Sequence, residues 1–369
     1  MQAARSMQRL AITGVLLCLT VVVLGAYVRL TAAGLGCPDW PGCDGHLTPR
    51  TAHGPGPGAA DALFAGGPLQ PGKARREMIH RYAAGTLALV IVLIAALAIG
   101  AQRQQLVSIP FALMLLATVS VQAVLGMLTV AWQLKPLVVT LHLVVGMTTL
   151  ALLWWLRLSL PSGSGITRPS QTAGRAMRGS TIAGIVMTRW VTLAALAAIA
   201  VQIALGGWTS SNYAAVACPD LPTCQNAWRP HADVRNAFVL WRGLNIDYEG
   251  GVLDNSARVA IHVAHRLGAV VTTAAVILAA VFVLRRRGLR GARARAYALL
   301  AALALQIVIG VSIVLDAFPL GLPTAHTAGA ALLLLAAVAL FRSLRQPLHA
   351  PECHCGGAGA LGHPRGVIC

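Results

Sequence analysis

Two His-Arg pairs, each at the start of a long apolar stretch, are the residues best suited to chemistry. The first belongs to the motif Glu77-x-x-His80-Arg81, and the second is His265-Arg266. A charged side chain at the centre of a membrane span costs roughly 2.5–3.5 kcal/mol, so such residues are rare there and usually functional. We therefore expect the rest of the chain to be organised around these two pairs.

One further histidine follows each pair. The separation between His80 and His142 equals that between His265 and His326 to within one position, and each later histidine lies in the first turns of its own apolar stretch. Two imidazoles at matched depth on neighbouring helices of a four-helix bundle are suited to bind heme iron from both sides. We predict one bis-histidine heme site in each half. The alternatives are neutral histidines that bond other helices, or zinc, which the lack of a recurring third ligand disfavours.

Other motifs repeat with equal spacing, which indicates a tandem duplication. The pattern Cys-Pro-Asp-x-Pro-x-Cys follows a glycine at the same distance in both halves, and a Gln-x-x-x-Gly motif precedes each later histidine, again at one shared distance. Each copy contains four apolar stretches, so both enter a membrane in the same direction and form a parallel repeat. The glycines and glutamines are Gly25, Gln122, Gly126, Gly206, Gln306 and Gly310.

The composition is that of a polytopic membrane protein. Hydrophobic residues make up 57% of the 369 residues and charged ones only 11%, against about 25% charged residues in soluble proteins. The net charge of +18 comes from arginines between apolar stretches, which favours the positive-inside rule over nucleic-acid binding. Stretches long enough to span a membrane are predicted at 10–29, 78–100, 106–131, 136–156, 190–209, 258–284, 296–316 and 322–341.

The fold class follows from these spans: an all-α integral membrane protein with eight transmembrane helices, as two tandem four-helix bundles related by a pseudo-twofold axis along the membrane normal. Arginine-rich segments share a side with the N-terminus, so we expect both termini in the cytoplasm, with an uncleaved signal-anchor at the start. The long loops 30–77 and 210–257 are then external. The predicted parts are an N-terminal half (1–160), a linker (161–189), a C-terminal half (190–341) and a disordered tail (342–369).

The halves differ one turn before the His-Arg pair, where Glu77 in the first corresponds to His262 in the second. This difference suggests divided labour, with a carboxylate doing chemistry at one site and a heme held for electron transfer at the other. A solvated residue at the rim is the alternative reading of Glu77. Arg81 and Arg266 are natural partners for heme propionates or, alternatively, for lipid phosphates.

The eight cysteines fall into three groups. Cys37 with Cys43, and Cys218 with Cys224, could each form a disulfide across a short external loop, as a structural clip or a redox-active pair. Cys18 is expected to be a buried core thiol. The tail holds a further group that is expected to be disordered, with soft-metal binding as the alternative: His349, Cys353, His354, Cys355, His363 and Cys369.

Taken together, these motifs resemble the heme A synthase family over about residues 10–341. The long first external loop and the Cys/His tail are not part of the family pattern. The matching segments are Gly25-Ala-Tyr-Val-Arg-Leu-Thr31, Gly34-Leu-Gly-Cys-Pro-Asp-Trp-Pro41, Glu77-x-x-His80-Arg81, His142, His265-Arg266 and His326.

The resemblance implies an oxidoreductase that converts heme O to heme A, by oxidising the C8 methyl to a formyl through two hydroxylations and loss of water. The product serves aa3-type terminal oxidases. It further implies that His80 and His142, with Arg81 beside them, face the heme O iron. His265 and His326 would be the axial ligands of a heme b cofactor, and Glu77 the acidic residue needed for the oxidation.

The resemblance also implies a bacterial plasma membrane location, with heme O synthase supplying the substrate. The electron donor is not named by the sequence, and a homo-oligomer is compatible with it. A di-heme b-type electron carrier is the main alternative function. A thiol–disulfide oxidoreductase would leave the four matched histidines unexplained, and a transporter would need polar residues at mid-membrane, whereas those here lie near the outer rim.

Overall fold

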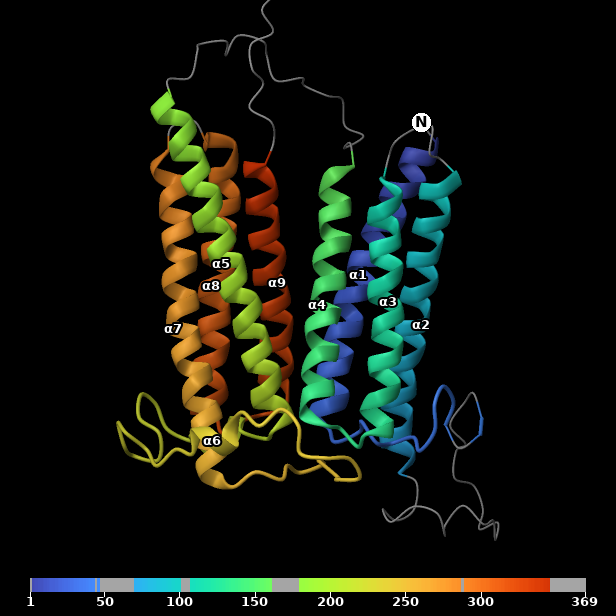
Figure 1. Cartoon of the computed structure of the whole chain (residues 1–369), viewed down its shortest axis with the longest axis vertical. Helices are drawn as coiled ribbons and strands as arrows, with labels where there is room; N and C mark the ends of the chain where they lie inside the picture. The colour runs from blue at the N-terminus through green and yellow to red at the C-terminus, as the bar shows by residue number, and fades with distance from the viewer. Residues whose placement is uncertain are drawn as a thin grey trace, which may run out of the picture.

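The computed structural model describes residues 2–43, 45–46, 70–100, 107–160, 179–286 and 289–345. Over these ranges the chain is helical, with two isolated β-bridges and no strand. The helices run side by side, and the segments 31–43 and 212–254 gather at one end, which we call the loop end (Figure 1). The elements are α1 Gln2–Leu30, α2 Pro71–Gly100, α3 Ile109–Ala131, α4 Pro136–Ser159, α5 Gly179–Ser211, η4 Ala215–Ala217, α6 Val234–Ala237, α7 Asn255–Arg285, α8 Arg290–Leu315 and α9 Gly321–Leu344.

Eight helices of the described chain are long and apolar enough to cross a membrane. Their spanning segments have 23 to 31 residues, and the mean hydropathy of their most apolar windows lies between 1.9 and 2.6. At 1.5 Å per residue, even α3 extends over roughly 35 Å, more than the ~30 Å of a hydrocarbon core. The prediction of an all-α protein with eight spans is confirmed, and the protein is a multi-pass membrane protein.

Several helices extend beyond the apolar stretches that predicted them. α5 begins at Gly179 and α2 at Pro71, ahead of the predicted starts at 190 and 78. Helical hydrogen bonds continue through polar turns, whereas a hydropathy pattern follows only the apolar part. Residues 179–189, predicted as linker, are therefore helical. Residues 342–344, predicted as the start of the tail, likewise belong to α9. The rest of that linker, residues 47–69 of the first loop and the tail after Arg345 lie outside the described residues.

The sequence repeat is also present in the backbone. Gln133 and Leu134, before α4, adopt φ values of 46° and 60°. Ala317 and Phe318, at the corresponding corner before α9, adopt 54° and 62°. Residues other than glycine are uncommon in this left-handed region. Two consecutive residues with positive φ at each of these equivalent corners therefore show that the two halves share the same local backbone conformation.

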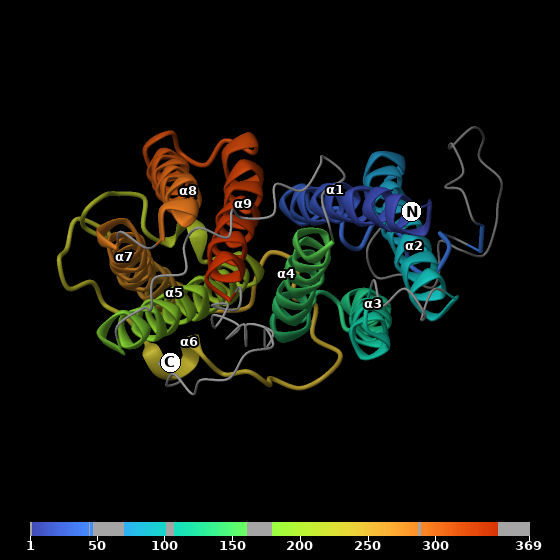
Figure 2. The ribbon, with the colours of Figure 1, turned by 90° about the horizontal axis from the view of Figure 1, so that it is seen from above.

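The helices form two groups when viewed along the bundle, α1–α4 on one side and α5, α7, α8 and α9 on the other (Figure 2). The groups meet where α4 packs on α5 and α9, and where α1 packs on α9. Replacing each helix by its repeat counterpart turns the α1–α9 contact into α5–α4 and leaves α4–α9 unchanged. A twofold relation would produce these contacts; the axis itself and the division into domains remain predictions.

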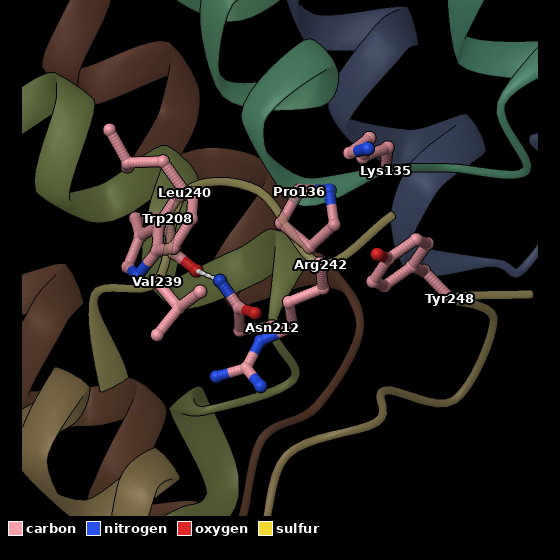
Figure 3. A pocket seen from close by; sticks show the side chains of 8 residues that line it. All are labelled: Lys135, Pro136, Trp208, Asn212, Val239, Leu240, Arg242 and Tyr248. Atoms are coloured by element: carbon pink, nitrogen blue, oxygen red, sulfur yellow. Dashed lines mark hydrogen bonds between the residues drawn. The ribbon is translucent and has the colours of Figure 1, made fainter. Parts of the chain in front are cut away.

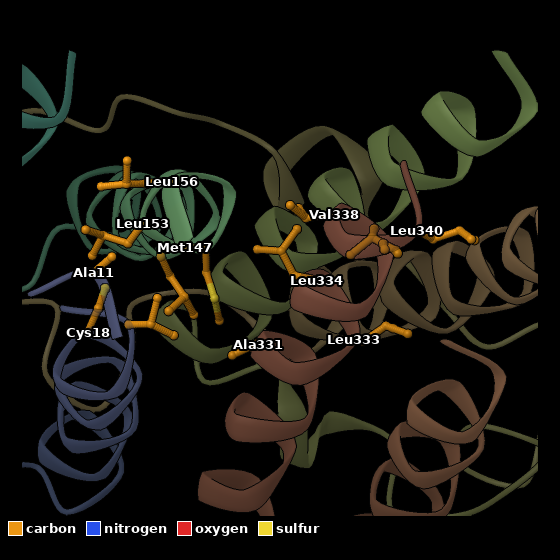
Figure 4. Close-up of a cluster of buried hydrophobic side chains, with 14 of the residues drawn as sticks. Ala11, Cys18, Met147, Leu153, Leu156, Ala331, Leu333, Leu334, Val338 and Leu340 are labelled. Atoms are coloured by element: carbon orange, nitrogen blue, oxygen red, sulfur yellow. The ribbon is translucent and has the colours of Figure 1, made fainter. Parts of the chain in front are cut away.

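One hydrophobic core runs through both groups in the half of the bundle away from the loop end. Leu150 and Leu153 of α4 and Leu340 of α9 are fully buried in it. Figure 4 shows side chains of α1 and α4 packed on one side of this core and those of α9 on the other. Trp154 also donates its indole N–H to the carbonyl of Leu335 on α9 at 3.0 Å. Because lipid tails are as apolar as leucine, close packing of this kind is what holds membrane helices together.

Candidate functional site

The four predicted histidines lie at matching places on four helices: His80 on α2, His142 on α4, His265 on α7 and His326 on α9. All four side chains are half-buried and lie toward the loop end of their helices. His80 and His142 are close enough to interact electrostatically, and so are His265 and His326. The two predicted histidines of each half therefore lie within electrostatic range of each other, and their role as heme ligands stays a prediction.

Each of these histidine rings packs against a glycine of a neighbouring helix. A methyl group added to Gly25 would lie 3.0 Å from the Cε1 atom of His80, and one added to Gly310 would lie 3.0 Å from that of His326. The corresponding distances are 3.5 Å between Gly126 and His142 and 3.3 Å between Gly206 and His265. The glycines that the repeat singled out therefore leave room for the imidazoles, a role that their spacing alone did not reveal.

Glutamine amides hold three of the four histidines. Gln122 donates to the carbonyl of His142 at 2.7 Å. Gln202 donates to the carbonyl of His265 at 3.0 Å and lies 3.1 Å from its Nδ1. Gln306 lies 3.1 Å from Nε2 of His326. Sequence reasoning missed Gln202, although it stands four residues before Gly206, as Gln122 and Gln306 do before their glycines.

His80 lacks such an amide. The position equivalent to Gln202 on α1, four residues before Gly25, is Val21. This is the first of several differences between the halves that fall around His80.

Two observations fit these histidine pairs to heme. First, the segments 19–27 of α1, 116–131 of α3 and 304–313 of α8, at the level of the histidines, contain no buried side chain, so the apolar core ends where the histidines begin. A large flat ligand would complete the packing there. Second, the Nδ1 atoms of His80, His142 and His326 are buried and have no hydrogen-bond partner within the described chain.

The described residues include no group of three or more histidines, cysteines or carboxylates that could hold a metal ion. A tetrahedral zinc site is thereby disfavoured in this part of the chain. Two nitrogens per site suit the axial positions of a heme, whose other four iron ligands come from the porphyrin.

Glu77 is buried, 4% exposed, one turn from His80. Its Oε2 atom accepts a hydrogen bond from the backbone N–H of Cys37 at 2.8 Å, and Oε1 pairs with the guanidinium of Arg81. The equivalent His262 is also buried, with Nδ1 3.0 Å from the carbonyl oxygen of Ala214. Glu77 is thus not a solvated rim residue, and the asymmetry read from the sequence is present in the side-chain contacts.

Arg81 and Arg266 both bind backbone carbonyls of the cysteine loops. Arg81 donates to Asp39 at 2.7 Å and to Gly42 at 2.5 Å. Arg266 donates to the carbonyls of Cys218, Asp220 and Thr223 at 2.7–3.1 Å. These loop contacts were not foreseen from the sequence; the propionate role of both arginines remains a prediction.

The cysteines of each loop lie at disulfide distance, with Cα–Cα separations of 4.9 Å for Cys37–Cys43 and 4.6 Å for Cys218–Cys224. All four are buried, as is the free thiol of Cys18. Each loop continues into a short antiparallel bridge, at Cys43–His46 and Cys224–Ala227. In the second loop, the hydrogen bond from the Thr223 hydroxyl lowers the pKa of Asp220, which also accepts the N–H groups of Gln225 and Asn226.

A further cluster, not foreseen from the sequence, joins the two halves at the loop end. Lys135, before α4, is 1% exposed; its ammonium lies 3.0 Å from the ring centre of Trp241 and donates to the carbonyl of Gly243. Tyr248 lies beside it and donates its backbone N–H to Gln133 at 3.1 Å. Figure 3 shows Lys135 and Tyr248 lining a small pocket with Trp208 of α5 and with Asn212, the residue after α5.

Two other contacts hold the second long loop over the first half. Arg29, at the end of α1, donates to the carbonyl of Ser210 at 3.0 Å and stacks on the ring of Tyr213. Lys73 of α2 pairs with Glu249 at 3.8 Å. The loop of the second half therefore contacts the loop ends of α1 and α2 as well as the corner before α4.

Comparison with known proteins agrees with this arrangement. The sequence profile described as "Cytochrome oxidase assembly protein" matches residues 8–338. The chain is similar to heme A synthase of Shewanella oneidensis, with 38% identity over 327 residues that cover 87% of this chain and 92% of that protein. The profile match covers most of each of the eight spans and both histidine pairs. The chain therefore belongs to the cytochrome oxidase assembly protein family.

Proposed function

We propose that this protein is a heme A synthase, an oxidoreductase that converts heme O to heme A by oxidising the C8 methyl to a formyl. The observation that carries the proposal is the unequal pair of histidine sites. Both halves pack their histidines against glycines in the same way, but only the first has a buried carboxylate, Glu77, one turn from a histidine. The similarity to the heme A synthase of Shewanella oneidensis supports the same function.

In this proposal the first half takes the substrate. His80 and His142 face the iron of heme O, and Gly25 and Gly126 keep room for their rings. Glu77 is the catalytic carboxylate, which accepts a proton or stabilises positive charge during the oxidation. Its burial strengthens either effect, because electrostatic interactions are less screened away from water.

The second half is proposed to hold heme b, through His265 and His326. Bound heme b would supply one-electron transfer to the oxidation. Gln202 and Gln306 bond these histidines and would fix the orientation of their rings, as outer partners of metal-binding histidines commonly do. His262, in the place of Glu77, leaves this site without a carboxylate at that position.

We place the loop end on the outer face of a bacterial plasma membrane and both termini in the cytoplasm. The support is the positive-inside rule. Residues 285–295, where α7 ends and α8 begins, carry six arginines, whereas Lys135 is the one charged residue between α3 and α4 at the loop end. A heme O synthase is the expected supplier of substrate. The electron donor is unidentified.

The test is chromatography of hemes extracted from a host that makes heme O but not heme A, with and without this chain. Heme A that forms only with the chain would establish the function. One alternative is a di-heme b-type electron carrier, which is supported by the similar packing of the two histidine pairs against glycines. That alternative predicts a red protein with heme B and heme O alone in the extract, even after candidate reductants are added.

A further inference from the structure

We propose that Arg81 and the disulfide loop Cys37–Cys43 are positioning elements that hold the Glu77 carboxylate in its working orientation. The inference deepens the proposed function and rests on it, because it assumes that Glu77 acts in the oxidation. It gives the first cysteine pair a specific role, the positioning of Glu77, in place of general loop stabilisation or redox chemistry.

The contacts of Glu77 account for both of its oxygens. Oε2 accepts the N–H of Cys37 at 2.8 Å, and Oε1 pairs with Arg81. The first contact comes from the loop backbone and the second from the helix that carries His80. A carboxylate held from two directions by charge-assisted hydrogen bonds has little freedom to rotate.

Arg81 connects these two partners to each other. One terminal nitrogen pairs with Glu77, while the other donates to the carbonyls of Asp39 and Gly42 within the disulfide loop. The planar guanidinium can make these bonds together because its donors point in fixed, divergent directions. Any movement of the loop is therefore passed to the carboxylate through one rigid group.

Close backbone contact brings the loop to Glu77. A methyl group added to Gly36 would lie 2.7 Å from the backbone carbon of Lys73 and 2.8 Å from the nitrogen of Ala74, both in the first turn of α2. Only glycine permits this approach, and it places the N–H of the next residue, Cys37, against Glu77. The glycine thus serves the carboxylate contact directly.

The second half has the same loop without this function. Arg266 binds only loop carbonyls among its hydrogen bonds, and the loop residue equivalent to Gly36 is Ala217. His262 replaces the carboxylate. A glycine at this position, and an arginine that bonds both the loop and a carboxylate, therefore occur only in the half that has Glu77. The second half can serve as a control for the effect of the loop on Glu77.

The experiment uses the full-length protein in detergent and infrared spectroscopy. The chain has 11 acidic residues. The difference spectrum between wild type and Glu77→Gln removes the bands of the other ten and isolates the Glu77 carboxylate band. Arg81→Met and Gly36→Ala, and the double change Cys37→Ala with Cys43→Ala, are expected to shift that band. The matched controls Arg266→Met, and Cys218→Ala with Cys224→Ala, are expected to leave it unchanged.

Rates of heme A formation give the second readout. Arg81→Met is expected to slow formation at least tenfold at saturating heme O, yet to add no further loss in a Glu77→Gln background, because Arg81 acts through Glu77. Glu77→Asp, which withdraws the carboxylate from Arg81, provides the background if Glu77→Gln is too slow to measure.

Three outcomes would overturn the inference: a Glu77 band unmoved by Arg81→Met, an equal loss of rate with and without Glu77, or a rise in the KM for heme O alone. The last would assign Arg81 to a heme propionate. A wild-type protein that makes no heme A would instead remove the proposed function, and the band would still report whether Arg81 holds Glu77.

Discussion

The two halves share one frame and differ around a single histidine. In both, glycines of neighbouring helices pack on the histidine rings, and an arginine after the first histidine binds the carbonyls of a disulfide loop. The differences are Glu77 for His262, Val21 for Gln202 and Gly36 for Ala217, and all three lie in the surroundings of His80 or its counterpart.

The comparison distinguishes the features that hold the histidines, which both halves share, from the features that we assign to the reaction, which are found around His80. The shared features are those needed to hold two imidazoles at a fixed depth. The second half adds an amide that fixes His265, as expected of a site with a permanent occupant. The first half replaces that amide with valine and adds a buried carboxylate, as expected of a site whose occupant is changed and released.

The largest effect is expected at the residue that distinguishes the halves. Glu77→Gln should lower heme A formation about 10²- to 10⁴-fold, the range typical of a lost acid–base group, while the heme b spectrum persists. The matched change His262→Gln should lower it less than tenfold. Extracted hemes and visible spectra measure both. Near-full activity in Glu77→Gln would remove the carboxylate from the reaction.

The next effect is on heme content. His265→Ala should abolish the heme b spectrum of the purified protein, because one of two axial ligands is lost. His80→Ala should retain that spectrum and lose product formation. A heme b spectrum that survives His265→Ala but disappears in His80→Ala would reverse the roles that we assign to the two halves.

A smaller, graded effect is expected at the glycines of the second half. An added methyl group would lie 3.0 Å from His326 at Gly310, but 3.3 Å from His265 at Gly206. Overpacking of this kind costs about 1–3 kcal/mol, so Gly310→Ala should weaken heme b binding more than Gly206→Ala. Titration of the apoprotein with heme measures both. Gly85→Ala, with no atom within 4 Å of the added methyl, is the control.

The smallest effect concerns stability at the junction of the halves. Burial lowers the pKa of Lys135 from its ordinary value of 10.5. The unfolded chain then binds more protons than the folded one between the two pKa values, so stability should rise as pH increases through that window. Thermal unfolding at several alkaline pH values should show this rise in the wild type. A rise of the same size in Lys135→Met would assign it to another group.

Much of the arrangement could be predicted because its signals are local. The eight spans follow from apolar stretches, and the histidine pairs, the cysteine loops and the place of Glu77 follow from repeated spacing. The same spacing singles out the glycines, but their function cannot be predicted from it, because it depends on which histidine ring of a neighbouring helix packs against each glycine. The start of α5 is predicted at 190, whereas the helix begins at Gly179, because polar turns outside the hydrocarbon leave no hydropathy signal.

Contacts between distant segments could not be predicted in this way. The bonds of Arg81 to Asp39 and Gly42 depend on how the loop folds back over α2. The burial of Lys135 depends on residues more than a hundred positions later in the chain. A lone lysine before a span reads as a solvated residue, and only the packing of the second loop on the first half makes it a buried one.

The contacts between α1 and α9, α4 and α5, and α4 and α9 are those of a symmetric dimer, in which the same surface serves both partners. The Lys135 cluster has no twin, since its repeat counterpart is Pro319. The junction is therefore asymmetric at the loop end, although the helix contacts between the two halves follow the repeat.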